Sequence, residues 1–315
     1  YATTQPSFIR VGHGLQHHDN GGMIVRNIAC LPALTGAWKY RGGGALKSNN
    51  GYHQVNERAV QRFDLLPRAT RTINMNELGK ALTSLDNPPV KALYVWNTNP
   101  AAVAPNQTSV IEGFRREDLF MAVHDVVLTD TCRYADVVLP ATTNWEHRDL
   151  YASYWHLHMA LAEPVIEAVG EAKPNIEVFR LLAKAMGFDD PCFDDSEEDI
   201  IRQALDYPKN PALEGVSFER LRDERVVHLN VTDKYVPFTE FYSARMAEDG
   251  HDPLPAHTPM PEPAGGLTLI TPPNHHFLNS TLAGVPELQA RAGRPALQIH
   301  PDDAAARGIE DGDRV

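Results

Sequence analysis

The stretch Val90–Pro140 reads VKALYVWNTNPAAVAPNQTSVIEGFRREDLFMAVHDVVLTDTCRYADVVLP, and it decides the fold class of this chain. It contains three short apolar runs, Ala92–Trp96, Leu119–Val123 and Ala135–Leu139. A short helix with one apolar face is predicted over Gln107–Phe114, between the first two runs. Apolar runs of this length, separated by helical or irregular segments, indicate parallel strands that are buried on both faces. We therefore predict an α/β fold built on a parallel sheet.

Each predicted strand is followed by small or hydrogen-bonding residues. The first ends in Asn97-Thr98-Asn99-Pro100, the second in His124-Asp125, and the third in Pro140-Ala141-Thr142-Thr143. In an open α/β sheet, ligands bind just beyond the carboxyl ends of the strands. Asp125 can accept two hydrogen bonds from a vicinal diol or from a guanine edge. A strand-end Asp equally caps the segment that follows it. This composition favours a nucleotide site, and thus a dinucleotide-binding (Rossmann-like) domain.

The composition excludes several classes of protein. The chain has 315 residues, of which 43% are hydrophobic and 22% charged, so it can hold one large or two ordinary domains. Its net charge of −12 argues against a nucleic-acid partner. Three distant cysteines without a CxxC pair exclude a cysteine-ligated zinc or iron–sulfur site within this chain and favour a reducing, cytoplasmic location, with a periplasmic one left open. No apolar run is long enough for direct membrane insertion.

Two glycine-containing segments lie near the start of the sequence. A strand predicted over Ser7–Val11 leads into Gly12-His13-Gly14-Leu15-Gln16 and then into a helix. A strand, glycine turn and helix present backbone N–H groups to an anion, although a plain tight turn fits the GxG equally well. The run Gly42-Gly43-Gly44 permits close approach of the backbone to a ligand, and it fits a flexible loop at least as well.

The rest of the chain divides by composition. Asn175 and Ser196 are predicted to cap helices over 176–186 and 197–205. Prolines then recur, and strands are predicted at Gly266–Thr271 and Pro295–His300. We predict an α/β domain over 1–206, a connecting region over 207–265, and the beginning of a β-barrel over 266–315. Both ends of the sequence favour a piece of a longer protein. His156-x-His158 is assigned to solvent-facing histidines, because no third metal ligand lies nearby in the sequence.

Several long passages match one family in order. These are TNP…HDVVLTDTCRYADVVLPATTNWEHRDLY, GEAKPNIEVFRLLAKAMGF, ALQIHPDDAAARGIEDGDRV and the opening GHGLQHHDNGGMIVRNIACLPALTGAWKYRGGG. Together they resemble the molybdopterin oxidoreductases of the dimethyl sulfoxide reductase type. The resemblance implies a bis(molybdopterin guanine dinucleotide) cofactor with molybdenum or tungsten, and two-electron redox chemistry on a small-molecule substrate. It also implies that residues 266–315 open a double-psi type barrel that binds the dinucleotide.

The resemblance also assigns cofactor-binding residues by position. It places Asn97 and Asn99 beside one guanosine and His124, Asp125 and Thr129 along the same nucleotide. The remaining contacts are Gly12, Gly14 and Gln16 to the pterin or its pyrophosphate, Gly43 and Gly44 to the cofactor's flank, and His275, His276 and Asn279 to the second dinucleotide. The protein ligand to the metal, and in many members an iron–sulfur cluster, would lie outside this chain. No catalytic or metal-binding residue is therefore assigned, the piece alone is expected to be inactive, and an electron-transfer protein or subunit is an expected partner.

Two alternatives remain open. A metal-free relative, such as the large peripheral subunit of the respiratory complex that oxidises NADH, would act as a scaffold, and its strand ends should be blocked by bulky side chains. An NAD-type dehydrogenase domain would require a complete G-x-G-x-x-G fingerprint. Gly12-His13-Gly14 lacks the third glycine, which argues against this second alternative.

Overall fold

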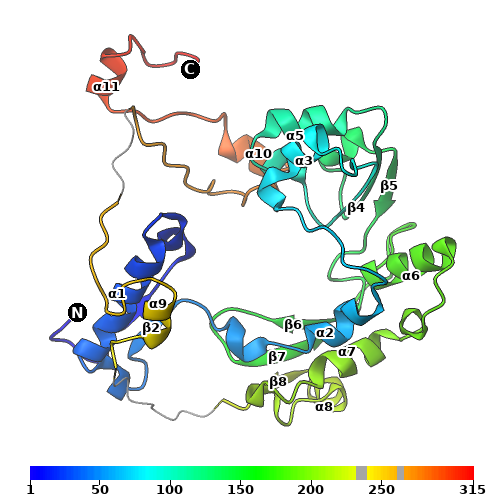
Figure 1. Cartoon of the computed structure of the whole chain (residues 1–315), viewed down its shortest axis with the longest axis horizontal. Helices are drawn as coiled ribbons and strands as arrows, with labels where there is room; N and C mark the ends of the chain where they lie inside the picture. Colours follow the sequence, from blue (N-terminus) through cyan, green and yellow to red (C-terminus); the bar gives the residue numbers. More distant parts are fainter. Residues whose placement is uncertain (232–239, 261–265) are drawn as a thin grey trace. The chain divides into compact units, whose positions relative to one another are not determined.

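The computed structural model describes residues 1–231, 240–260 and 266–315 (Figure 1). They form two compact units, each assembled from two parts of the chain. Unit 1 comprises Tyr1–Thr70 and Ala141–Thr268, and unit 2 comprises Arg71–Pro140 and Leu269–Val315. Residues 232–239 and 261–265 of the predicted connecting region lie outside the described residues. The domain limits at 206 and 265 stay predictions.

The elements follow one another in an irregular alternation of strands and helices. The strands are β1 (Phe8–Arg10), β2 (Gly44–Leu46), β3 (Ala92–Trp96), β4 (Phe120–Asp125), β5 (Val137–Pro140), β6 (Asp149–Ala152), β7 (His158–Ala162) and β8 (Val226–His228). The α-helices are α1 (Gly21–Leu34), α2 (Glu57–Gln61), α3 (Leu78–Ser84), α4 (Pro100–Val103), α5 (Gln107–Phe114), α6 (Asn175–Met186), α7 (Glu197–Leu205), α8 (Phe218–Glu224), α9 (Ala244–Glu248), α10 (Pro286–Ala292) and α11 (Pro301–Ala305).

The predicted parallel sheet is confirmed in unit 2. Strands β3, β4 and β5 pair side by side in that order, all parallel, with Trp96 opposite His124 and Asp125 opposite Pro140. Asp136 joins β4 to the start of β5, because its N–H donates to the Met121 carbonyl at 2.8 Å and its carboxylate accepts from the Met121 N–H at 2.7 Å. Helix α5 lies between β3 and β4 in the sequence, as expected for a strand–helix–strand unit.

Helices α3 and α5 cover one face of this sheet (Figure 1). They approach closely because Gly113 of α5 faces Leu82 of α3, where a Cβ would lie 2.4 Å from the Leu82 Cβ. The core beneath them is apolar throughout. It comprises Leu82, Val95, Ala101, Val110, Phe114, Leu119, Met121 and Val123.

The prediction that these strands are buried on both faces is confirmed for the centre of β4, where residues 121–124 are all buried, and is wrong for β3 and β5. Side chains alternate along a strand, so Val95 and Met121 point to the helices while Trp96 and Phe120 point to the other face. Trp96 is 47% and Phe120 53% exposed, because α3 and α5 both pack on the same side. Only the centre of the second face, at Ala122 and His124, is buried.

Unit 1 holds two further sheets. Strands β1 and β2 are parallel, with Phe8 opposite Gly44, and α1 connects them. Strands β6, β7 and β8 form an antiparallel sheet against α7 and α8. Its core comprises Met159, Leu161, Ile201, Leu205, Ala212, Leu213, Val216, Phe218, Leu221, Val227 and Leu229. Ser196 caps α7 as predicted, in a reciprocal capping box with Asp199.

The predicted strands at Gly266–Thr271 and Pro295–His300 are not formed within the described residues. Each strand needs a neighbour to bind its backbone N–H and C=O groups, and neither segment has one there. Their apolar side chains are exposed instead, as at Ile270 and Leu297. A short helix, α11, begins at Pro301. Every helix in the described stretches is too short or too polar to cross a bilayer.

Candidate functional site

The carboxyl ends of β3, β4 and β5 lie at one edge of the unit 2 sheet, because neighbouring parallel strands end on the same side. We call this the strand-end edge and define it by Asn97–Asn99, His124–Thr129 and Pro140. Its backbone is locked at the first turn, where Asn97 has a left-handed φ of 51° and its N–H donates to the His124 carbonyl at 3.2 Å. Asparagine tolerates this conformation better than most residues. The predicted convergence of polar strand ends is therefore present in unit 2.

Asn99 ties the turn after β3 to the loop after β4. It is only 7% exposed, and its Oδ1 accepts from the Thr131 N–H at 3.2 Å and the Thr131 hydroxyl at 2.7 Å. Its Nδ2 donates to the Asp130 carboxylate at 3.3 Å. The fully buried Thr131 hydroxyl in turn accepts from the Ala101 N–H at 3.1 Å. Asn99 is thus a positioning residue of the edge, and its predicted contact with a guanosine stays a prediction.

Asp125 is the edge residue with spare hydrogen-bonding capacity. It is half-buried at the end of β4, and its Oδ1 accepts from the Val126 N–H at 2.7 Å. Its second carboxylate oxygen has no hydrogen bond to any residue that the structure describes. An ionised carboxylate offers about four acceptor positions, so Asp125 retains the capacity for a diol or a guanine edge.

The other two predicted residues of this edge are less accessible. His124 is fully buried in the sheet, and its ring centroid lies 6.5 Å from that of Tyr94. Burial also raises the pKa of the Tyr94 phenol. Thr129 shapes the loop, since its carbonyl accepts from the Cys132 N–H and its hydroxyl lies 3.3 Å from the Cys132 Sγ. Nucleotide contacts by His124 and Thr129 stay predictions.

The loop after β4 differs from the small, polar composition expected of a strand end. Val126, Val127 and Leu128 follow Asp125 directly, and Leu128 is 83% exposed. Beside them, Asn97 is exposed and Asp125 is half-buried. The aliphatic side chains add an apolar border that the sequence analysis overlooked.

The parallel pair β1–β2 in unit 1 carries the predicted glycine turn. Gly12 and Gly14 have open space where a Cβ would stand, and His13–His17 form a 3₁₀ turn before α1. The close packing is at Gly21, the first residue of α1, where a Cβ would come within 2.6 Å of the Gln16 Cα. The turn is therefore fixed against α1, with its glycines uncovered. Contacts of Gly12, Gly14 and Gln16 with a pterin stay predictions.

The glycine run has a different explanation from either expectation. A Cβ on Gly43 would lie 2.1 Å from the Ala37 carbonyl oxygen, and one on Gly44 would lie 2.5 Å from the Trp38 ring. Gly44 also has a φ of 117°, which disfavours any residue with a side chain. These glycines allow β2 to pack against the turn after α1, and the loop is not a free one. Their predicted cofactor contact is untested.

Four contacts between distant segments lie near the glycine turn. Asn49, buried after β2, donates from Nδ2 to the Ser153 carbonyl at 3.2 Å and the His156 carbonyl at 2.7 Å. The segment it holds places the Trp155 ring 3.8 Å from the Arg10 guanidinium carbon. The Tyr154 ring stands edge-on to His13, with centroids 6.3 Å apart. Because these partners are separated by more than 100 residues, no local signal in the sequence connects them.

The predicted barrel residues lie in a short exposed segment. His275 and His276 stack edge to face at 5.2 Å, and the His276 N–H donates to the Asn274 Oδ1 at 2.8 Å. Asn279 has a left-handed φ of 51° in a turn closed by Leu278 and Thr281. Their contact with a dinucleotide stays a prediction. In the described part of the chain, no group of three His, Cys, Asp or Glu side chains could hold a metal ion.

Comparisons with known proteins place these features in a family. The family model described as molybdopterin oxidoreductase matches residues 2–185, and the model for the molybdopterin dinucleotide binding domain matches residues 267–315. The chain is 48% identical over 322 residues to the Probable oxidoreductase YoaE of Bacillus subtilis, covering 99% of this chain and 47% of that protein. It is 28% identical over 347 residues to the dimethyl sulfoxide/trimethylamine N-oxide reductase of Rhodobacter capsulatus, covering 96% and 41%.

Among solved structures, the acetylene hydratase of Pelobacter acetylenicus is similar with a TM-score of 0.45 at 23% identity, over 59% of this chain and 26% of that one. That similarity is too low for conclusions about this chain. The chain spans about half the length of the curated relatives that it matches. Because the first family model covers more than half of its residues, the chain belongs to the molybdopterin oxidoreductase family.

Proposed function

We propose that the full-length protein is an oxidoreductase that carries out two-electron chemistry on a small molecule at a bis(molybdopterin guanine dinucleotide) cofactor. This chain would contribute the residues that hold the dinucleotide. The observation that carries the proposal is the strand-end edge, where Asp125 keeps an unused acceptor beside the exposed Asn97. Membership of the family supports it, as does the match of residues 267–315 to the dinucleotide binding domain.

The residues present fit an anionic dinucleotide. Asp125 would accept from a ribose diol or a guanine edge, and the amide of Asn97 would add a neutral donor and acceptor. Asn99 and Thr131 would keep the two loops at a fixed separation, so that these groups are oriented before the ligand arrives. In unit 1, the open glycine turn would present backbone N–H groups to phosphate oxygens. When bound, the cofactor supplies the redox chemistry, and the protein orients it.

The proposal is tested on the full-length protein by measuring bound molybdenum or tungsten and the guanine nucleotide released on denaturation. We expect two guanine nucleotides for each metal ion. Protein that holds neither would instead act as a metal-free scaffold, the alternative that the sequence left open. Such a result would contradict the proposed function for the whole protein.

A sharper test replaces the side chain that carries the proposal. Asp125→Ala should lower the guanine nucleotide content several-fold with little change in thermal stability, because the side chain is at the edge and not in the core. Asp86→Ala is the matched control, since Asp86 is an exposed carboxylate in the loop before β3, at the opposite end of the same strands. Equal nucleotide content in the two variants would remove Asp125 from the site.

A further inference from the structure

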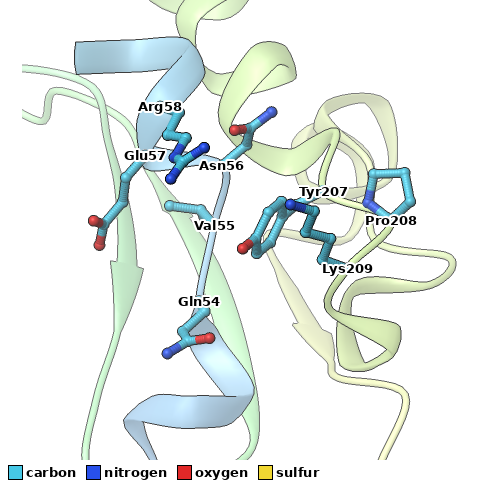
Figure 2. Close-up of a pocket in the computed structure, with 8 residues that line it drawn as sticks. All are labelled: Gln54, Val55, Asn56, Glu57, Arg58, Tyr207, Pro208 and Lys209. Atoms are coloured by element: carbon cyan, nitrogen blue, oxygen red, sulfur yellow. The ribbon is translucent and has the colours of Figure 1, made fainter. Parts of the chain in front are cut away.

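A cavity of about 600 Å³ lies in unit 1, and none of the residues that line it is predicted to bind the cofactor (Figure 2). Two segments far apart in the sequence form it. One is Gln54–Arg58, which leads into α2, and the other is Tyr207–Lys209, which follows α7. A volume of this size suits a small organic ligand. We call this cavity the basic pocket.

Hydrogen bonds from two asparagine side chains hold the walls of the basic pocket together. Asn210, which is buried, donates from Nδ2 to the Tyr52 carbonyl at 3.0 Å and the Gln54 carbonyl at 2.8 Å. Asn56 donates to the Asp206 carbonyl at 3.0 Å, and its backbone N–H donates to the Ala204 carbonyl at 2.8 Å. The two walls are therefore bound to each other, and the cavity is preformed.

Four of the polar side chains that line the pocket have no partner among the described residues. The guanidinium of Arg58, the ammonium of Lys209, the hydroxyl of Tyr207 and the side-chain amide of Gln54 make no hydrogen bond or ion pair within residues 1–231, 240–260 and 266–315. The acidic residue of the lining, Glu57, directs its carboxylate away from the Arg58 guanidinium in Figure 2. The Glu57 carboxylate therefore does not neutralise the Arg58 guanidinium.

Arg58 and Lys209 differ from the arginines of unit 1 that are paired with carboxylates. The chain carries a net charge of −12, and Arg148 has carboxylate partners at 2.8 and 2.7 Å and Arg220 one at 2.7 Å. In so acidic a chain, two cations left open on facing walls attract anions from solvent. Guanidinium and ammonium groups bind carboxylate and phosphate oxygens through charge-assisted hydrogen bonds.

Part of the lining is apolar. Val55 and Tyr207 pack on the core of the antiparallel sheet, and Pro208 completes the wall. We propose that the basic pocket binds a small organic anion, with its carboxylate or phosphate between Arg58 and Lys209 and its apolar body against Val55, Tyr207 and Pro208. The proposal assigns a second ligand to the protein and does not depend on the cofactor.

Isothermal titration calorimetry on the full-length protein tests this, with phenyl phosphate and benzoate as anionic probes and benzyl alcohol as an uncharged one. We expect saturable binding of at least one anion, and binding of benzyl alcohol at least about tenfold weaker. Arg58→Gln and Lys209→Gln should each lower the affinity for the anion about tenfold or more. Lys184→Gln, which removes an exposed charge on α6 of the same unit, should leave it unchanged.

Three outcomes would overturn the proposal. The first is no saturable binding of either anion, and the second is equal binding by the double variant Arg58→Gln/Lys209→Gln. The third is loss of bound guanine nucleotide together with anion binding in the single variants, which would assign the pocket to the cofactor. Thermal melting of each variant separates these results from misfolding. Because nucleotide content is measured in the same samples, failure of this proposal is distinguishable from failure of the proposed function.

Discussion

The strand-end edge and the basic pocket use polar residues in opposite ways. At the edge, the motif residue Asn99 is buried, and its side chain is hydrogen-bonded to Thr131 and Asp130. In the pocket, Arg58 and Lys209 are exposed and bind no described residue. A residue in a recognisable motif can therefore act by holding the backbone in place, whereas a residue outside any motif can have all its bonding capacity left for a ligand.

The largest effect should come from the core beneath the edge. Met121→Ala should cost about 2–5 kcal/mol of unfolding free energy, because the side chain is fully buried under α3 and α5. Its neighbour Phe120 points to the other, open face, so Phe120→Ala should cost less than about 1 kcal/mol. Urea unfolding of the full-length protein measures both. A large cost for Phe120→Ala would mean that the second face is covered in the full-length protein.

An intermediate effect is expected from the positioning residue of the edge. Asn99→Ala should cost about 1–3 kcal/mol, because it leaves the buried Thr131 N–H without an acceptor. Thr98→Ala, one residue away and exposed, is the matched control and should change stability by less than about 0.5 kcal/mol. Urea unfolding compares the two, with guanine nucleotide content as a second readout. If Asn99→Ala lost nucleotide without losing stability, Asn99 would be a direct ligand contact.

The smallest effects should separate paired from unpaired cations in unit 1. Burial opposes ionisation of the Glu163 carboxyl, but hydrogen bonds from Arg148 and Arg225 outweigh it and hold its pKa below the ordinary value of 4.5. Glu163→Gln should therefore cost about 1–2 kcal/mol at neutral pH. Arg58→Gln breaks no described contact and should change stability by less than about 0.5 kcal/mol.

The pH dependence of the Glu163 effect follows from the direction of its pKa shift. A carboxyl whose pKa is lowered by folding stabilises the folded state above its unfolded pKa, and this stability is lost as the pH falls through the folded value. The difference between the parent protein and Glu163→Gln should thus be constant near neutral pH and shrink below about 4.5. Thermal melts from pH 7 down to about 3 measure it. A difference independent of pH would mean that the ion pair does not carry the effect.

Local pattern predicted much of the fold. The strand Ala92–Trp96 and the helices Gln107–Phe114 and Glu197–Leu205 appear at their expected bounds, because their apolar spacing and caps act within a few residues. The prediction of barrel strands at 266–271 and 295–300 was wrong, because a strand depends on a neighbouring strand that the local sequence does not supply. At the candidate site, the position of Asp125 at a strand end was predictable. The buried role of Asn99 was not, since Thr131 lies 32 residues away.

By itself, the sequence determined that β3, β4 and β5 are parallel and that polar residues follow them, because hydrophobic periodicity and turn residues act over short distances. The motifs alone likewise indicated the family to which the chain belongs. Only the tertiary structure decided which polar groups are hydrogen-bonded to other residues and which stay available to a ligand. That distinction depends on hydrogen bonds and cavities between distant segments, such as Gln54 and Asn210, which lie 156 residues apart, and local sequence patterns do not encode them.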